Sequence, residues 1–224
     1  MNPMDRVKGA FLKEAENYLR TLAHKYAAML ERQMANRIEE MKKDDTEHYL
    51  LYQVLGITES EGELIDIYQN KGRFLYKYAG SFLEESAIYC FQRKFPNAVP
   101  KLKVPNSIGK RPKTFEIDCL VGTSAYEIKW RDATTDGDHI TKEHTRLQVI
   151  RAANFKPIRL MFYRPNRDQA RKIQATLKTL YEGVDGEYYS GSEAWAVLKS
   201  ITGLDLKFLL KTIANENTRK KESS

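Results

Sequence analysis

The segment Phe115–Arg131 reads FEIDCLVGTSAYEIKWR, and its pattern decides how the rest of the chain is interpreted. Two short apolar runs flank a Gly-Thr-Ser turn, which is typical of a β-hairpin. Side chains two residues apart on a strand share a face, so Glu127 and Lys129 project together. If the arms pair around residues 122–124, Asp118 lies roughly opposite Glu127 or Lys129. The hairpin therefore places two carboxylates and an ammonium on one patch, which is either a surface ion cluster or a metal site that cuts a phosphodiester.

The composition of the 224-residue chain limits the classes of protein to which it can belong. At 42% hydrophobic residues it can form one large domain, or a core with a helical extension. No run approaches the roughly 18 apolar residues of a membrane span, and the charged N-terminal region lacks a signal-peptide core. Cys90 and Cys119 both lie in apolar stretches, which predicts buried free thiols. We therefore expect a soluble, cytoplasmic protein without a membrane partner.

The charge of the chain favours a polyanionic partner. Its net charge is +7 and its isoelectric point is about 9.2. Between Ile140 and Lys172 there are nine Lys or Arg residues and only two acids, Glu143 and Asp168. Seven of the nine are not adjacent to another basic residue, so we interpret them as a spread surface for phosphate contact. The alternative is a solvated helix face.

Periodicity and turn residues predict the order of the elements. Helices are expected over residues 5–43, 46–55, 64–70 and 73–95, and Glu84 and Glu85 lie in the middle of the last of these. A strand over 99–104, the hairpin strands 114–121 and 124–130, a helix over 140–153 and a strand over 157–163 follow. Asn166 is expected to cap a basic helix, and a glycine-rich turn over 183–191 to precede helices 192–200 and 204–215. This order predicts an N-terminal helical region (1–71), a core (72–182), and C-terminal helices with a charged tail (183–224).

The residues of the hairpin suit metal-assisted phosphodiester hydrolysis, which needs a positioned water and neutralisation of developing charge. Mg²⁺ prefers carboxylate oxygens, backbone carbonyls and water as ligands. Asp118 and Glu127 offer two carboxylates, and the backbone carbonyl of Ile128 is a candidate third ligand. Lys129 is placed to orient or help deprotonate the attacking water and to offset charge on the phosphate.

Asp118, followed after eight residues by Glu127-Ile128-Lys129, resembles the signature of the PD-(D/E)XK nuclease superfamily. Ile117 stands where that family usually has a proline. The element order over about residues 72–165 resembles the αβββαβ core of the family. The resemblance implies an α/β (α+β) fold with a mixed central sheet and additional N-terminal and C-terminal helices. The sequence around Glu84 resembles the core helix that adds an acidic ligand in many members, so Glu84 is the further metal-ligand candidate and Glu85 its alternative.

Within the superfamily the chain is most similar to stand-alone type II restriction endonucleases, in particular the ApaLI-like group. The resemblance implies a homodimer that cuts short, often palindromic sites in double-stranded DNA with Mg²⁺, for which Mn²⁺ substitutes. The N-terminal helices are candidates for the dimer surface. The residues implied to contact DNA are Arg131, Lys142, Arg146, Arg151, Lys110 and Arg111.

Two other functions remain open from the sequence. A structure-selective nuclease, such as a junction resolvase or a repair enzyme, would share the same catalytic patch. A catalytically silent basic module would instead bind nucleic acid through Arg159–Lys172, with the hairpin charges as a surface ion network. The chain contains no G-x-x-x-x-G-K-[ST] loop, so we expect no nucleotide cofactor.

Overall fold

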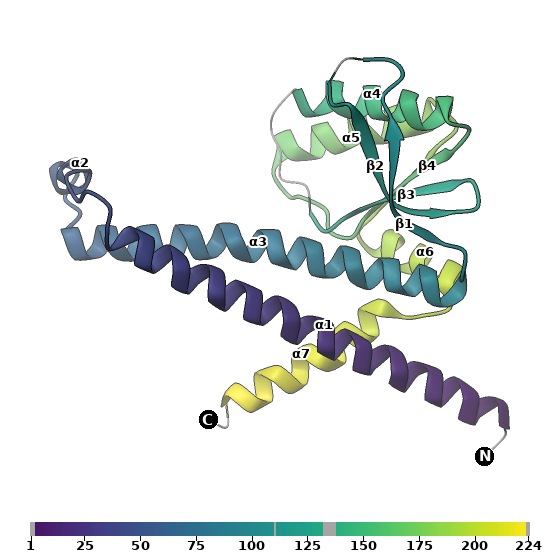
Figure 1. Ribbon diagram of the computed structural model, residues 1–224, viewed down its shortest axis with the longest axis horizontal. Helices are drawn as coiled ribbons and strands as arrows, with labels where there is room; N and C mark the ends of the chain where they lie inside the picture. Colours follow the sequence, from purple (N-terminus) through teal and green to yellow (C-terminus); the bar gives the residue numbers. More distant parts are fainter. Residues whose placement is uncertain (1–2, 110, 132–137, 223–224) are drawn as a thin grey trace. The chain divides into compact units, whose positions relative to one another are not determined.

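The computed structural model describes residues 3–109, 111–131 and 138–222. Over these residues the chain forms seven helices and five strands (Figure 1). Their order is α1 (Pro3–Met41), α2 (Tyr49–Val54), α3 (Glu59–Lys94), β1 (Val99–Pro105), β2 (Thr114–Val121), β3 (Ser124–Lys129), α4 (Asp138–Ala152), β4 (Lys156–Met161), α5 (Asp168–Glu182), β5 (Glu187–Ser190), α6 (Ser192–Thr202) and α7 (Leu206–Glu222).

The five strands form one mixed sheet in the order β1-β2-β3-β4-β5. The pairs β1–β2 and β2–β3 are antiparallel, whereas β3–β4 and β4–β5 are parallel. The parallel pairs are joined through α4 and α5, as crossover connections require. This arrangement confirms the predicted mixed α/β fold of the restriction-endonuclease type.

Both faces of the sheet are covered at β3. The ring of Phe91, from the C-terminal part of α3, lies 4.3 Å from the ring of Tyr126, measured between centroids. Glu127, the residue after Tyr126, points to the opposite face of the sheet because side chains alternate along a strand. There it bonds to Arg146 of α4. In Figure 1, α4 and α5 lie together on one side of the sheet. The polar side chains of the hairpin are thus enclosed under α4.

By its internal contacts the chain divides into two units. One contains the chain up to Glu16 and from Leu83 onward, and includes the whole sheet with α4–α7; the other contains Asn17–Phe82. Within the second unit, Tyr26 contacts both Tyr78 and Phe82, with ring centroids 6.3 and 6.1 Å away. The domain boundaries expected at residues 71 and 182 stay predictions.

Helix α3 differs most from the sequence-based expectation. It is one continuous helix over Glu59–Lys94, whereas separate helices were predicted on either side of Lys71-Gly72. A glycine inside a helix costs only about 1 kcal/mol relative to alanine, and that is too little to break a helix supported by packing.

The end of the chain also contains structure that the sequence did not indicate. The segment predicted to be a glycine-rich turn contains the short strand β5, which pairs with β4 at the edge of the sheet. Helix α5 is capped at Arg167 rather than at Asn166. Helix α7 continues to Glu222, beyond the predicted end at residue 215. In the described ranges no helix combines the length and the apolar character needed to cross a membrane.

Candidate active site

The two strands of the hairpin separate at Asp118. The turn consists of Gly122-Thr123, and Gly122 has a φ of 58°, in the left-handed region that favours glycine. Registered pairs continue from the turn to Cys119↔Tyr126. Beyond that pair, the backbone N–H of Ile128 donates to Oδ2 of Asp118 at 2.7 Å. The Asp118 carboxylate of β2 is thus hydrogen-bonded to the main chain of β3. We call the point where the two strands separate, at Asp118 and Ile128, the fork.

The two acids of the fork are buried. Asp118 is 6% exposed and Glu127 is 7% exposed, which excludes a solvated surface ion cluster. Burial, supplemented by the charge of Glu127, raises the pKa of Asp118 to about 6. The carboxylate of Asp118 is therefore held in an environment that disfavours its own negative charge, and an additional cation nearby would stabilise it.

Glu127 and Lys129 form a tight ion pair. Nζ of Lys129 lies 2.5 Å from Oε1 of Glu127 and 4.0 Å from Oδ2 of Asp118. Burial alone would raise the pKa of Glu127, but the charges of Arg146, Lys129 and Arg159 outweigh it and hold that pKa below its ordinary value. Burial likewise opposes the charge of Lys129, yet Glu127 and Asp118 raise its pKa. Lys129 is consequently an ammonium at neutral pH in this state of the protein.

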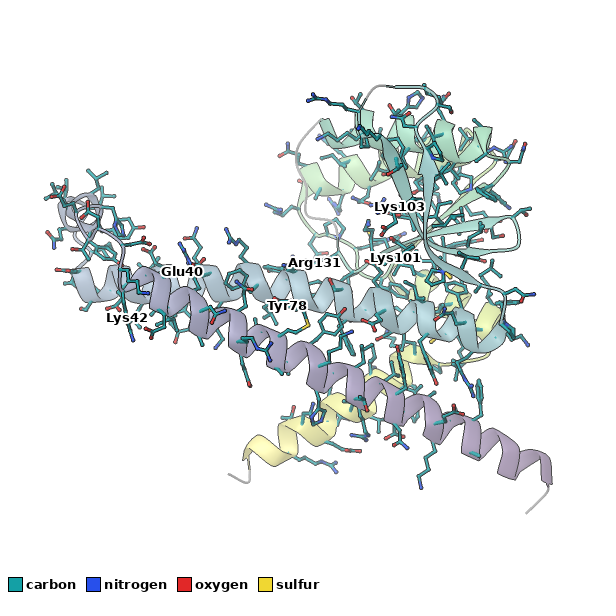
Figure 2. The ribbon with its side chains drawn as sticks, viewed as in Figure 1. Glu40, Lys42, Tyr78, Lys101, Lys103 and Arg131 are labelled. Carbon is teal, nitrogen blue, oxygen red and sulfur yellow. The ribbon has the colours of Figure 1, made fainter. Side chains whose placement is uncertain are left out.

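A second lysine, Lys101 of β1, lies among the carboxylates of the fork. Its ammonium contacts the carboxylate of Glu84, and lies 3.4 Å from Oε1 of Glu116 and 3.8 Å from Oδ1 of Asp118. Lys101 has a φ of 54°, which is rare for a residue with a side chain and is found at functional sites. Figure 2 shows Lys101 extending from β1. Of the two glutamates proposed from the sequence, Glu84 is thus the one whose carboxylate shares this cation with Asp118.

The donors at the fork suit a hard divalent cation. Oε1 of Glu84 is buried and is ion-paired with the Lys101 ammonium. Asp118 adds a second carboxylate whose charge is poorly compensated. Carboxylate oxygens are the ligands that Mg²⁺ prefers. Within the described ranges no three His, Cys, Asp or Glu side chains are grouped closely enough to enclose a metal ion, and the Lys101 ammonium lies between the carboxylates instead.

Arg146 is buried, whereas the sequence analysis expected it to contact DNA. It is 7% exposed, and its guanidinium pairs with Glu127 and donates to the backbone carbonyl of Glu116 at 2.8 Å. It thereby bridges the separated strands of the fork. The expectation that Arg146 contacts DNA phosphates is corrected accordingly, since its donors are committed inside the protein. Its position indicates that it orients Glu127.

Glu143, one of the two acids between Ile140 and Lys172, is the centre of a buried network. Its Oε1 accepts hydrogen bonds from Tyr181 at 2.7 Å, from Arg159 at 3.2 Å and from Arg146 at 3.3 Å. Arg159 is 0% exposed, so it does not belong to the basic surface to which we assigned it. Both arginines were counted as surface residues because composition does not distinguish a buried charge from a solvated one. In retrospect, the position of Arg159 between Ile158 and Leu160 in an apolar strand was a signal of a buried ion pair.

The remaining residues expected to contact DNA lie on the surface where they are described. Arg111, Arg131, Lys142 and Arg151 are exposed. The guanidinium of Arg131 lies 5.8 Å from the ring centre of Trp130, and Arg151 pairs with Asp185 at 3.6 Å. Lys110 lies outside the described residues.

Lys101 was not proposed from the sequence, because its place opposite Asp118 depends on the β1–β2 register, which sequence does not set.

Comparison with known proteins gives the family of the chain. A model of the ApaLI-like restriction endonuclease family matches residues 6–215, which is most of the chain. The chain belongs to the ApaLI-like restriction endonuclease family. Membership in this family makes the chain a DNA endonuclease, as the sequence predicted. No curated protein and no solved structure matched the chain.

Proposed function

We propose that the protein is a Mg²⁺-dependent type II restriction endonuclease that cuts double-stranded DNA at a specific site and acts as a homodimer. The observation that carries this proposal is the fork, where the carboxylates of Glu84 and Asp118 converge on the Lys101 ammonium beside the Glu127–Lys129 pair. Buried carboxylates around a cation, next to a charged lysine, are the parts that phosphodiester hydrolysis requires.

Asp118 and Glu84 are the residues best placed to hold Mg²⁺, with the backbone carbonyl of Ile128 as a third ligand. When bound, Mg²⁺ would neutralise charge on the scissile phosphate and lower the pKa of a coordinated water. Glu127 differs from the other carboxylates because both its oxygens already have cationic partners, Lys129 and Arg146. It would reach the metal by giving up one of these partners, or would act by positioning Lys129.

Lys129 supplies positive charge and protons at the fork. Its pKa is raised by the neighbouring acids, so in this state it is a hydrogen-bond donor. The Lys129 side chain is 37% exposed, which leaves it able to contact a phosphate oxygen or a water. We assign it the roles of orienting the attacking water and offsetting charge on the phosphate.

Of the two alternatives, the structure weighs against the silent basic module. That hypothesis required Asp118 and Glu127 to be a surface network and Arg159 to be a surface cation, and all three are buried. A structure-selective nuclease would use the same fork, and differs only in the DNA that it cuts.

A plasmid-cleavage assay distinguishes these functions. We expect supercoiled plasmid DNA to be cut to discrete bands with Mg²⁺ or Mn²⁺, and to remain intact with EDTA. A smear, or cutting confined to branched substrates, would contradict a sequence-specific enzyme. Cutting that persists in EDTA would contradict metal dependence.

A further inference from the structure

A buried series of hydrogen bonds leads from helix α5 to the fork, and the proposed mechanism gives its far members no role. Tyr181 of α5 is 1% exposed, and its hydroxyl donates to Oε1 of Glu143 at 2.7 Å. Nη1 of Arg146 donates to the same oxygen at 3.3 Å, and Nη2 of Arg146 pairs with Oε2 of Glu127. We call Tyr181, Glu143 and Arg146 the Glu143 clamp. Through it a tyrosine of α5 is connected to a carboxylate of the fork.

The guanidinium of Arg146 is fixed at three points. Besides its bonds to Glu143 and Glu127, its Nη2 donates to the backbone carbonyl of Glu116 at 2.8 Å. A guanidinium is planar and its donors point in set directions, so three acceptors allow it a single orientation. Glu143 and Arg146 are three residues apart on α4 and therefore share one face of the helix. The position of the Glu143 carboxylate thus sets the position of the guanidinium.

The two carboxylate oxygens of Glu127 have different partners. Oε2 pairs with Arg146, whereas Oε1 lies 2.5 Å from Nζ of Lys129. Because Arg146 is itself held on its far side by Glu143, it fixes the rotation of the Glu127 carboxylate as well as its charge. Oε1 is consequently the oxygen that Glu127 presents to the lysine of the fork.

Glu143 lies between two buried arginines. It also accepts a hydrogen bond from Arg159 at 3.2 Å, and Arg159 is in register with Glu127 on the neighbouring strand. A buried ion network is by itself weak evidence of a stabilising role, because the cost of desolvation offsets the attraction of the charges. Here one end of the network is a carboxylate of the fork, so its geometry has a consequence for the reaction.

We propose that Glu143 is a positioning residue for DNA cleavage. Held by the Tyr181 hydroxyl, it fixes Arg146 on Oε2 of Glu127, so that Oε1 is the oxygen that serves the fork. If Glu127 reaches a metal ion, the partner that it gives up is then Lys129 and not Arg146. This role rests on the proposed endonuclease function. The geometry of the clamp does not, because it requires neither DNA nor a metal.

Two neighbouring tyrosines give a matched test. The ring of Tyr188 lies 6.1 Å from that of Tyr181, and its hydroxyl donates to Oε1 of Gln174 at 2.6 Å, outside the clamp. Tyr181→Phe and Tyr188→Phe therefore each remove one buried hydroxyl and change no charge. We expect Tyr181→Phe to lower the single-turnover cleavage rate about tenfold and Glu143→Gln about a hundredfold, since small displacements of a reacting group cost this much. Tyr188→Phe should cleave within about twofold of wild type.

Measuring DNA affinity in Ca²⁺ and melting temperature alongside separates positioning from stability. All rates are taken well below the melting temperature of every variant, and we expect each variant to bind DNA within a few-fold of wild type. Equal cleavage rates in Tyr181→Phe and Tyr188→Phe would overturn the proposal, even if both variants melt earlier than wild type. If Glu143→Gln does not fold, the tyrosine pair decides the outcome.

A spectroscopic measurement on the protein without DNA or metal tests the clamp independently of activity. In protein labelled with ¹⁵N-arginine, the Nη signals of Arg146 are identified by their loss in Arg146→Lys. We expect these signals to move in Tyr181→Phe and to stay in place in Tyr188→Phe. Unmoved signals in Tyr181→Phe would overturn the clamp. Absence of cleavage by the wild type would instead overturn the endonuclease function and the catalytic role that rests on it, whatever the Arg146 signals show.

Discussion

At the scale of single residues, the fork contains two buried acids whose surroundings affect them in opposite ways. Burial raises the pKa of Asp118 to about 6, whereas three cations hold the pKa of Glu127 below its ordinary value. At neutral pH the ionised Asp118 therefore destabilises the metal-free folded protein, whereas the ionised Glu127 stabilises it.

We predict that Asp118→Asn stabilises the metal-free protein at pH 8. A carboxyl group with a raised pKa disfavours folding once it is ionised, and at about 1.4 kcal/mol per pKa unit the cost is at most about 3 kcal/mol. The cost should shrink as the pH falls through about 6, and it is lost below the ordinary pKa of 3.8, where Asp118 is protonated in both the folded and the unfolded state. Thermal unfolding in EDTA at pH 8 and pH 4.5 measures the difference.

The matched variant is Glu127→Gln, which should destabilise the protein at pH 8. Removing this charge leaves Arg146 and Lys129 buried without their partner, a loss of about 3–5 kcal/mol. The stability that Glu127 provides is present above its ordinary pKa and declines as the pH falls below it. Equal effects of the two variants at pH 8 would contradict the opposite electrostatic roles.

A further prediction at this scale concerns Lys101. Because its ammonium occupies the space between Glu84 and Asp118, Lys101→Met should increase the affinity for Mn²⁺ on the order of tenfold. Calorimetric titration of Mn²⁺ in the absence of DNA measures this. Lys103→Met, two residues along β1 at an exposed position, is the control (Figure 2). Unchanged or weaker Mn²⁺ binding by Lys101→Met would show that the ammonium does not compete with the metal.

At the scale of elements, the sequence predicted the strands and helices of the core with bounds close to those observed. The hairpin, the helix with Glu84 and the strand containing Arg159 all follow from local periodicity. The continuity of α3 and the presence of β5 do not follow from local periodicity. Each depends on packing against residues distant in sequence, which outweighs the local preference of glycine for turns. Two glycines illustrate this difference: Gly72 lies inside the continuous helix α3, whereas Gly186 lies in the turn before β5.

We predict that Gly72→Ala and Gly186→Ala have opposite effects on stability. A Cβ at position 72 would meet nothing within 4 Å, so alanine should stabilise α3 by about 0.5–1 kcal/mol. A Cβ at position 186 would lie 2.6 Å from the carbonyl oxygen of Pro157 and 2.8 Å from that of Tyr181. That substitution should destabilise the protein by about 1–3 kcal/mol. Urea unfolding followed by circular dichroism measures both, and a stabilising Gly186→Ala would contradict the close packing at that turn.

At the scale of the whole molecule, the sequence indicated the family and the fork but misjudged the basic surface. The spacing of Asp118 and Glu127-Ile128-Lys129 was sufficient because adjacent strands bring these positions together in any hairpin of that length. Which basic residues lie on the surface and which lie in the interior could not be predicted, since this depends on the burial of Glu143, a residue of α4. Arg146 and Arg159 are thus part of the buried structure around the fork. For phosphate contact we propose exposed residues such as Lys142 and Arg111.

The measurement that tests the central claim most directly is DNA cleavage under single-turnover conditions by wild type, Lys129→Met and Lys103→Met, each with its DNA affinity measured alongside in Ca²⁺. If the fork is the catalytic centre, Lys129→Met should lose at least a thousandfold in cleavage rate while binding DNA within a few-fold of wild type, because an interaction made mainly in the transition state is lost. Lys103→Met should cleave at close to the wild-type rate. Cleavage by Lys129→Met at the wild-type rate would contradict the account and place the reaction elsewhere on the protein.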